Sequence, residues 1–108
     1  MMLVFEKDDG GLMAFPSAER AIAQCELIDV ENGEYEFCDH EGQKYTYAIT
    51  GQPGLFSPGK YTLVPEGVPD IQHILKLADK ARCFEGKRCN LSNMDELKAL
   101  ISKSKGVS

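Results

Sequence analysis

The fold of this chain is decided by residues 34 to 50, which run Glu-Tyr-Glu-Phe-Cys-Asp-His-Glu-Gly-Gln-Lys-Tyr-Thr-Tyr-Ala-Ile-Thr. Aromatic and aliphatic side chains alternate here with polar ones, which is the period of a half-buried β-strand. The turn residues His40-Glu41-Gly42 divide the stretch into two such strands, 34–39 and 44–50. The pattern therefore predicts an antiparallel meander in this part of the chain.

The preceding residues extend the predicted meander by one strand. Asn32-Gly33 is a strong two-residue hairpin motif, because both central positions of a type I′ turn need a positive φ. We therefore expect Leu27 to Val30 to pair with Glu34 to Asp39. In that arrangement Tyr35 and Phe37 face one side of the sheet, and Glu34 and Glu36 lie together on its exposed side.

The remaining elements follow on either side of the meander. Residues 3–5 and 12–15 predict two short strands around a glycine turn, and 61–64 predict a last strand. Helices are predicted over 17–25, from Asp70 to Cys83, and over 92–103. Two prolines and three glycines indicate an exposed loop over 51–59. The sequence thus predicts one α+β domain over 1–108, with an antiparallel sheet of about five or six short strands, one early short helix, and two C-terminal helices packed on one face.

Composition places the chain among ordinary globular domains. Its 108 residues are 43% hydrophobic and 27% charged, enough to bury one core. No stretch approaches the roughly 20 apolar residues of a membrane-spanning helix, and the short apolar run at the amino terminus has no basic flank. We therefore expect a cytosolic protein with no membrane role, in which all four cysteines are thiols.

Catalytic and metal-binding patterns are weak. Cys38 and His40 are two residues apart and would share a face, as a thiol nucleophile and its base require, but a core thiol beside a turn histidine explains them as well. Adding Cys83 and Cys89 gives the ligand types of a zinc site. The six-residue spacing of those two cysteines argues against a zinc knuckle. We predict a non-enzymatic protein with no metal and no cofactor.

The most distinctive feature is an acidic run, residues 26 to 41, that contains no Lys or Arg. Residues 1 to 70 carry 13 acidic and four basic side chains, a formal charge of −9, whereas residues 71 to 108 carry +4. Crowded carboxylates repel one another, and a basic partner would relieve this repulsion while associating faster. The other interpretation is a solvated strand face. The predicted partner-binding residues are Asp29, Glu31, Glu34, Tyr35, Glu36, Asp39 and Glu41; Tyr45, Tyr47 and Phe56 are further aromatic candidates.

The stretch Ile28-Asp29-Val30-Glu31-Asn32-Gly33-Glu34-Tyr35-Glu36-Phe37, followed by Asp39-His40-Glu41-Gly42, resembles small bacterial immunity-type proteins of polymorphic or contact-dependent toxin systems. The resemblance covers roughly the first half of the chain and contains no catalytic motif. It implies a small acidic cytosolic protein that neutralises a toxin domain, often a nuclease, by occluding its surface. It implies nothing definite about the fold.

Two alternatives to protein binding are left open by the sequence. The Pro- and Gly-rich loop 51–59 is typical of a small-molecule-binding or regulatory domain, and Cys38 with His40 is the pair an enzyme would use. An isoelectric point near 5 argues against nucleic acid as a partner, although basic residues such as Lys87 and Arg88 gather in the C-terminal part. The sequence does not decide the oligomeric state.

Overall fold

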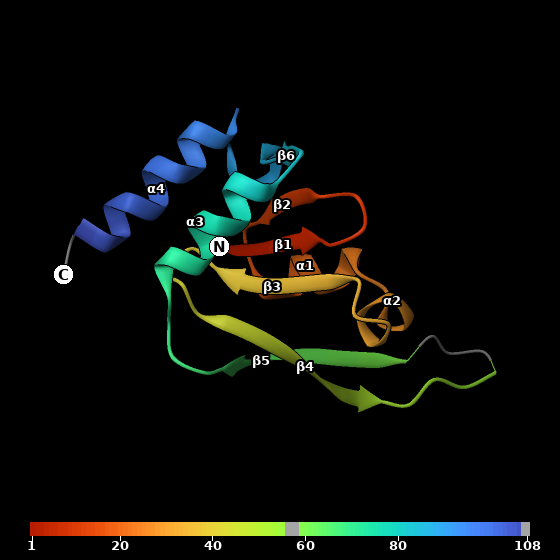
Figure 1. Cartoon of the computed structure of the whole chain (residues 1–108). Helices are drawn as coiled ribbons and strands as arrows, with labels where there is room; N and C mark the ends of the chain where they lie inside the picture. Colours follow the sequence, from red (N-terminus) through yellow and green to blue (C-terminus); the bar gives the residue numbers. More distant parts are fainter. Residues whose placement is uncertain (56–58, 107–108) are drawn as a thin grey trace.

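The computed structural model describes residues 1–55 and 59–106. One mixed sheet of six strands runs through the molecule in the order β5-β4-β3-β1-β2-β6 (Figure 1). The strands are β1 (Met2–Glu6), β2 (Gly11–Phe15), β3 (Tyr35–Asp39), β4 (Lys44–Gly51), β5 (Lys60–Glu66) and β6 (Cys83–Glu85). The helices are α1 (Ala18–Gln24), α2 (Leu27–Glu31), α3 (Ile71–Lys80), α4 (Met94–Gly106) and the short 3-10 turn η1 (Lys87–Cys89). The predicted α+β class is confirmed, with a six-stranded sheet and helices near the three predicted segments.

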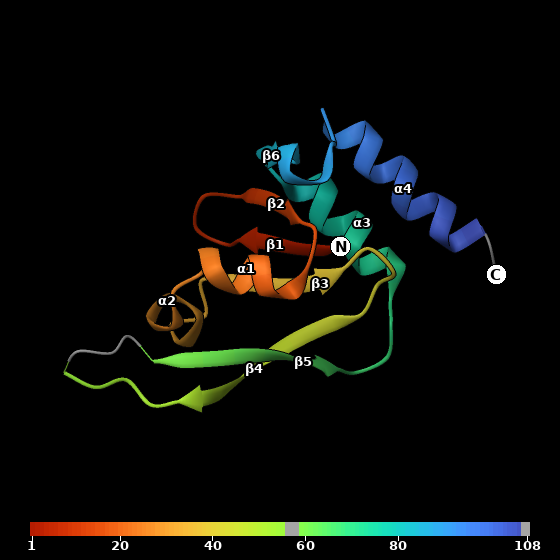
Figure 2. The same cartoon turned by 180° about the vertical axis from the view of Figure 1, so that it is seen from behind.

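The two faces of the sheet are covered by different helices. On one face, Leu3 and Phe5 of β1 pack with Ile74 of α3 and Leu97 of α4. On the other face, alternate β1 residues pack against α1 and α2 (Figure 2). Because β1 is buried on both faces, its sequence is apolar at consecutive positions rather than alternating. The two C-terminal helices therefore share one face, as predicted.

The predicted strand over Leu27 to Val30 is wrong, because these residues form α2. Leu27 and Val30 lie three residues apart, so a helical turn buries both against the α1 side of the sheet. The predicted type I′ turn is wrong as well. Asn32 has φ −76° and only Gly33 has a positive φ, of 72°.

Gly33 instead ends α2 in a Schellman motif. Its N–H donates to the Val30 carbonyl at 3.0 Å, and the N–H of Glu34 donates to the Asp29 carbonyl at 3.1 Å. The left-handed conformation needed at this position explains the glycine. The same residue pair that predicted a hairpin thus closes a helix and directs the chain into β3.

A second correction concerns the end of α3. The helix was expected to reach Cys83, but it ends at Lys80 and residues Cys83 to Glu85 pair in parallel with β2. The N–H of Arg82 donates to the Gly10 carbonyl at 2.7 Å, which aligns this short strand, and Phe84 then packs against the α3 side of the core. Pairing with β2 therefore places these residues in a strand, although their helical spacing alone predicts that they continue α3.

β4 and β5 form a twisted two-stranded arm that leaves the body of the sheet (Figures 1 and 2). β4 pairs with β3 at only two register positions, near its start, and with β5 along its whole length. The arm gives the molecule its long dimension of 47 Å. Over the described part of the chain, no helix is both long and apolar enough to span a bilayer.

Candidate functional site

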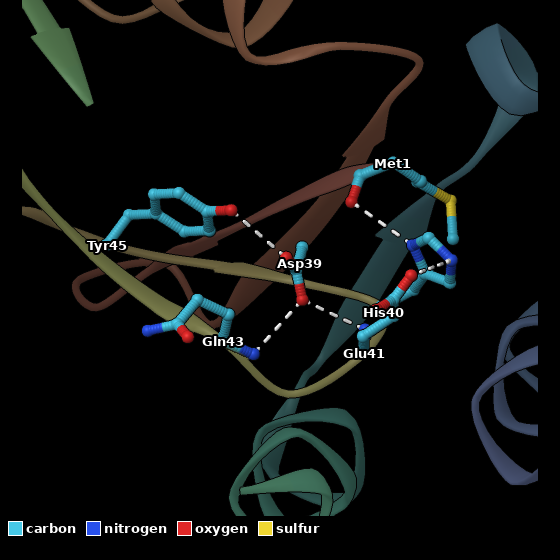
Figure 3. Close-up of polar contacts among 6 residues, drawn as sticks. All are labelled: Met1, Asp39, His40, Glu41, Gln43 and Tyr45. Atoms are coloured by element: carbon cyan, nitrogen blue, oxygen red, sulfur yellow. Dashed lines mark hydrogen bonds and ion pairs between the residues drawn. The ribbon is translucent and has the colours of Figure 1, made fainter. Parts of the chain in front are cut away.

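The predicted acidic residues do not form one face. The carboxylate of Asp39 shapes the β3–β4 turn: its Oδ1 accepts from the N–H groups of Glu41 at 2.9 Å and Gln43 at 3.0 Å, and its Oδ2 accepts from the Tyr45 hydroxyl at 3.1 Å (Figure 3). Such a carboxylate is a structural element of the turn. Glu41 remains exposed beside it.

Glu34 and Glu36 lie in different surroundings, so their predicted common surface is wrong. Glu36 is half-buried and forms an ion pair with His73 of α3. Glu34 lies beside α2, where a hydrogen bond to the Asp29 carboxyl, followed by weaker effects that include Asp8, raises its pKa. The two carboxylates therefore have different partners, one in α3 and one in α2, and Glu31 is an exposed acidic residue of α2.

The proposed pair of Cys38 and His40 is not assembled. Cys38 is buried in the core against α3, and burial raises the pKa of its thiol to about 12. The His40 ring nitrogens lie near the Met1 carbonyl, at 3.5 Å, and the Glu41 carboxylate, at 3.9 Å (Figure 3). A protonated, buried thiol is a poor nucleophile and a poor metal ligand. Among the described residues, no group of three or more His, Cys, Asp or Glu has the arrangement of a metal site.

A concave groove lies between α1–α2 and the end of the β4–β5 arm. Its volume is about 880 Å³. The helices supply apolar residues to its wall, including Ile22, Cys25, Leu27 and Ile28. The arm and the ends of its loop supply Thr50, Pro53, Gly59 and Tyr61. We call this feature the α1–α2 groove.

Two contacts hold the walls of the groove in place. The buried Tyr61 hydroxyl donates to the Cys25 carbonyl at 2.6 Å, which fastens β5 to the C-terminal end of α1. Gly59 has φ 83°, and a Cβ at this position would lie 2.9 Å from Leu27 Cδ2. A glycine therefore lets the arm pass close to α2.

Three exposed apolar side chains belong to the elements that form the groove. Ile28 on its wall is 65% exposed, and Leu55, two residues beyond Pro53, is 97% exposed. Ile49 is 40% exposed and lies opposite Tyr61 in the ladder, so it shares that face of the arm. Of the five large exposed hydrophobic residues of the described chain, Ile28 lines the groove, and Ile49 and Leu55 belong to the elements that form it.

The charged residues of the groove are two carboxylates and one amine. Glu26 and Glu31 line it from the helix side, and Lys60 lines it from the arm. Cys25 also lines the groove, but burial raises the pKa of its thiol to about 11, so it stays protonated at neutral pH. This arrangement suits binding of apolar groups next to positive charge, and the Cys25 thiol is not activated as a nucleophile.

Sequence reasoning missed this groove because it assigned α2 to a strand. The available clue was the spacing of Leu27 and Val30, which predicts a helical turn with Ile28 pointing outward. Of the predicted residues, only Glu31 lines the groove. Tyr35, Tyr45 and Tyr47 pack against the α1–α2 side of the core, and Phe56 lies outside the described residues.

Comparison with known proteins gives no relative for this chain. No family model, no curated protein and no solved structure matches it.

Proposed function

We propose that this protein is a non-catalytic protein-binding domain, which docks apolar side chains of a basic partner in the α1–α2 groove. The observation that carries the proposal is the 65% exposed Ile28 on a concave apolar wall, with the exposed Ile49 on the same face of the arm as the lining residue Tyr61. Contiguous exposed apolar surface is typical of interaction sites, because single exposed hydrophobic residues are usually scattered.

Charge supports a basic partner. Glu26 and Glu31 line the groove, and the first 70 residues carry a formal charge of −9. A cationic rim on the partner would gain favourable contacts here and associate faster at low salt. Neutralisation of a basic toxin domain, such as a nuclease, is the use of such docking that the immunity-type resemblance implies.

The first experiment is capture of partners from the protein's own cells with tagged wild-type protein and two variants in which one side chain is shortened to alanine. Ile28→Ala removes an apolar side chain that the partner would cover, worth about 1–2 kcal/mol at ~0.8 kcal/mol per buried methylene, or roughly 5- to 30-fold in affinity. Val68→Ala is the matched control, since Val68 is 83% exposed and does not line the groove.

We expect wild type and Val68→Ala to retain one stoichiometric basic protein. Ile28→Ala should retain less of it. Its retention should also fall as salt is raised. Equal retention by both variants, or a partner insensitive to both Ile28→Ala and Glu31→Lys, would contradict docking in the groove.

A second candidate is a small apolar molecule in the same groove. The volume of about 880 Å³ lies within the range of about 300–1,000 Å³ that small-molecule sites occupy. The ends of loop 51–59 line the groove, which agrees with the alternative prediction from sequence. Native mass spectrometry of protein purified from its own cells would reveal a bound molecule, and a bare mass would favour the protein partner.

A further inference from the structure

The β4–β5 arm leaves one edge of β4 without a neighbouring strand. β4 pairs with β3 only through Lys44 and Tyr45, whereas its ladder with β5 continues to Gly51. From Thr46 onward, none of the described strands pairs with the side of β4 that faced β3. β3 and β4 diverge here, and a cavity of about 340 Å³ separates Thr46 and Tyr47 from Tyr35 and Phe37. The arm leaves the body of the sheet at this point (Figures 1 and 2).

The direction of the backbone groups along this edge follows from the turn that precedes it. The Asp39 N–H donates to the Gln43 carbonyl at 2.9 Å, so residue 43, and with it 45, 47 and 49, directs its N–H and C=O groups away from β5. Pro65 lies opposite Tyr45 and has no N–H to contribute, which agrees with this assignment. Tyr47 and Ile49 therefore present two donors and two acceptors at the free edge.

The composition of this edge differs from that of the two outer edges of the sheet. Residues 46 to 50 run Thr-Tyr-Ala-Ile-Thr, uncharged, free of proline and rich in residues that favour strands. The outer strand β5, by contrast, carries Lys60, Pro65 and Glu66, and β6 is only three residues long. Charge, proline, shortness and bulges are the usual protections of an edge. Residues 46 to 49 of β4 have no charge and no proline, and the one irregularity in the ladder lies at their end, between Ile49 and Gly51.

We propose that the free edge of β4, residues 46 to 50, accepts an extended segment of a partner protein as an added strand. The segment's main chain would hydrogen-bond to Tyr47 and Ile49, and its alternate side chains would lie beside Ile49 on one face and Ala48 on the other. This inference rests on the proposed function in that a protein partner exists, but it concerns a different surface and a different kind of contact.

Charge argues for a partner rather than a second copy of this chain. Two copies paired edge to edge would each bring a net charge of −5, and β4 belongs to the part of the chain that carries −9. The negative charges of the two copies repel each other and oppose their association, whereas a basic segment is attracted to this charge. The probe is therefore a synthetic eight-residue peptide that alternates Val and Lys.

The readout is amide hydrogen exchange, measured residue by residue on ¹⁵N-labelled protein. In dilute protein without peptide, the Tyr47 and Ile49 amides should exchange at least tenfold faster than that of Ala48, which points toward β5. Saturating peptide should slow the exchange of Tyr47 and Ile49 at least tenfold and leave Ala48 unchanged. A peptide that carries N-methyl groups on every second residue should lose this effect when those residues face β4.

Two variants at one position separate the backbone donor from the side chain. Ile49→Pro removes the donor at the free edge and leaves the ladder with β5 intact, as Pro65 does on the neighbouring strand. Ile49→Thr removes the apolar side chain and keeps the donor. We expect Ile49→Pro to bind the peptide at least fivefold more weakly than Ile49→Thr, with the Ala48 amide protected in both.

Three outcomes would overturn the inference. The first is slow exchange of Tyr47 and Ile49 in dilute protein, and the second is no response to the peptide. The third is protection that rises with protein concentration alone, together with a dimer in sedimentation, which would assign the edge to a second copy. Ile28→Ala keeps this test distinct from the proposed function, because it weakens docking in the groove and leaves peptide protection at β4 unchanged.

Discussion

The hydroxyl of Tyr61 should contribute measurably to stability, and Tyr61→Phe removes it while keeping the ring. The hydroxyl donates at 2.6 Å to the Cys25 carbonyl, which lies beyond the last helical turn of α1, and Tyr61 is only 8% exposed. Loss of the bond from a buried carbonyl costs about 1–2 kcal/mol. For 108 residues, at ~2.1 cal/mol/K per residue, this corresponds to a fall in Tm of roughly 4–9 °C.

Urea and thermal unfolding followed by far-UV circular dichroism are the suitable assays, because the chain contains no tryptophan. Tyr47→Phe is the matched control: Tyr47 lies on the same face of the arm, and the structure gives its hydroxyl no hydrogen bond among the described residues. Tyr47→Phe should change the free energy of unfolding by less than 0.5 kcal/mol, a typical limit for a surface substitution. Equal stability of the two variants would refute the role assigned to the Tyr61 hydroxyl.

Three further predictions concern thiols, pH and glycines. At pH 8, Cys83, which is exposed, should react with a thiol reagent in the folded protein, whereas Cys25 and Cys38 should react only on unfolding. Burial raises the pKa of the Cys25 thiol to about 11 and that of Cys38 to about 12, whereas an unfolded thiol has a pKa near 8.5. The stability that these two protonated thiols contribute is therefore complete below about pH 8.5 and is lost as the pH rises. The urea midpoint should fall between about pH 8 and 11. Gly42→Ala should cost about 2–4 kcal/mol, because a Cβ there would lie 2.8 Å from the backbone at the start of α3; Gly33→Ala, with open space around it, should cost about 1 kcal/mol in a urea titration.

Local sequence patterns predicted most of this fold because they act over a few residues. Alternation predicted β3 and β4. Two helices were predicted to begin at Ser17 and Asp70, and the side chains of these residues accept backbone N–H groups at the starts of α1 and α3. Asn32-Gly33 failed because a left-handed glycine serves a helix end as well as a hairpin. What decided between them was burial of Leu27 and Val30 under the sheet, a tertiary contact that the local pattern does not contain.

The candidate site was less predictable than the fold for a related reason. A count of carboxylates along the chain gives charge, but it does not show which of them the protein uses internally. Asp39 holds a turn and Glu36 pairs with His73, so neither is free for a partner, whereas Glu31 is exposed on the groove. The apolar residue of the groove wall, Ile28, was not recognised as exposed because residues 27 to 30 were assigned to a strand. The acidic charge of the surroundings nevertheless remains the feature that points to a basic partner.

The groove and the free edge of β4 are neighbouring parts of one arm. Thr50 lines the groove and also ends the free stretch of β4, and Ile49 lies between the two features. A strand added along β4 would therefore bring the adjoining part of the partner close to the groove. Main-chain pairing binds many sequences with similar strength, whereas an apolar groove with Glu26 and Glu31 beside it discriminates by shape and charge. Pairing along β4 would hold a partner segment in place, and the groove would select among segments by their side chains. A segment that makes both contacts would bind more tightly than one that makes either contact alone.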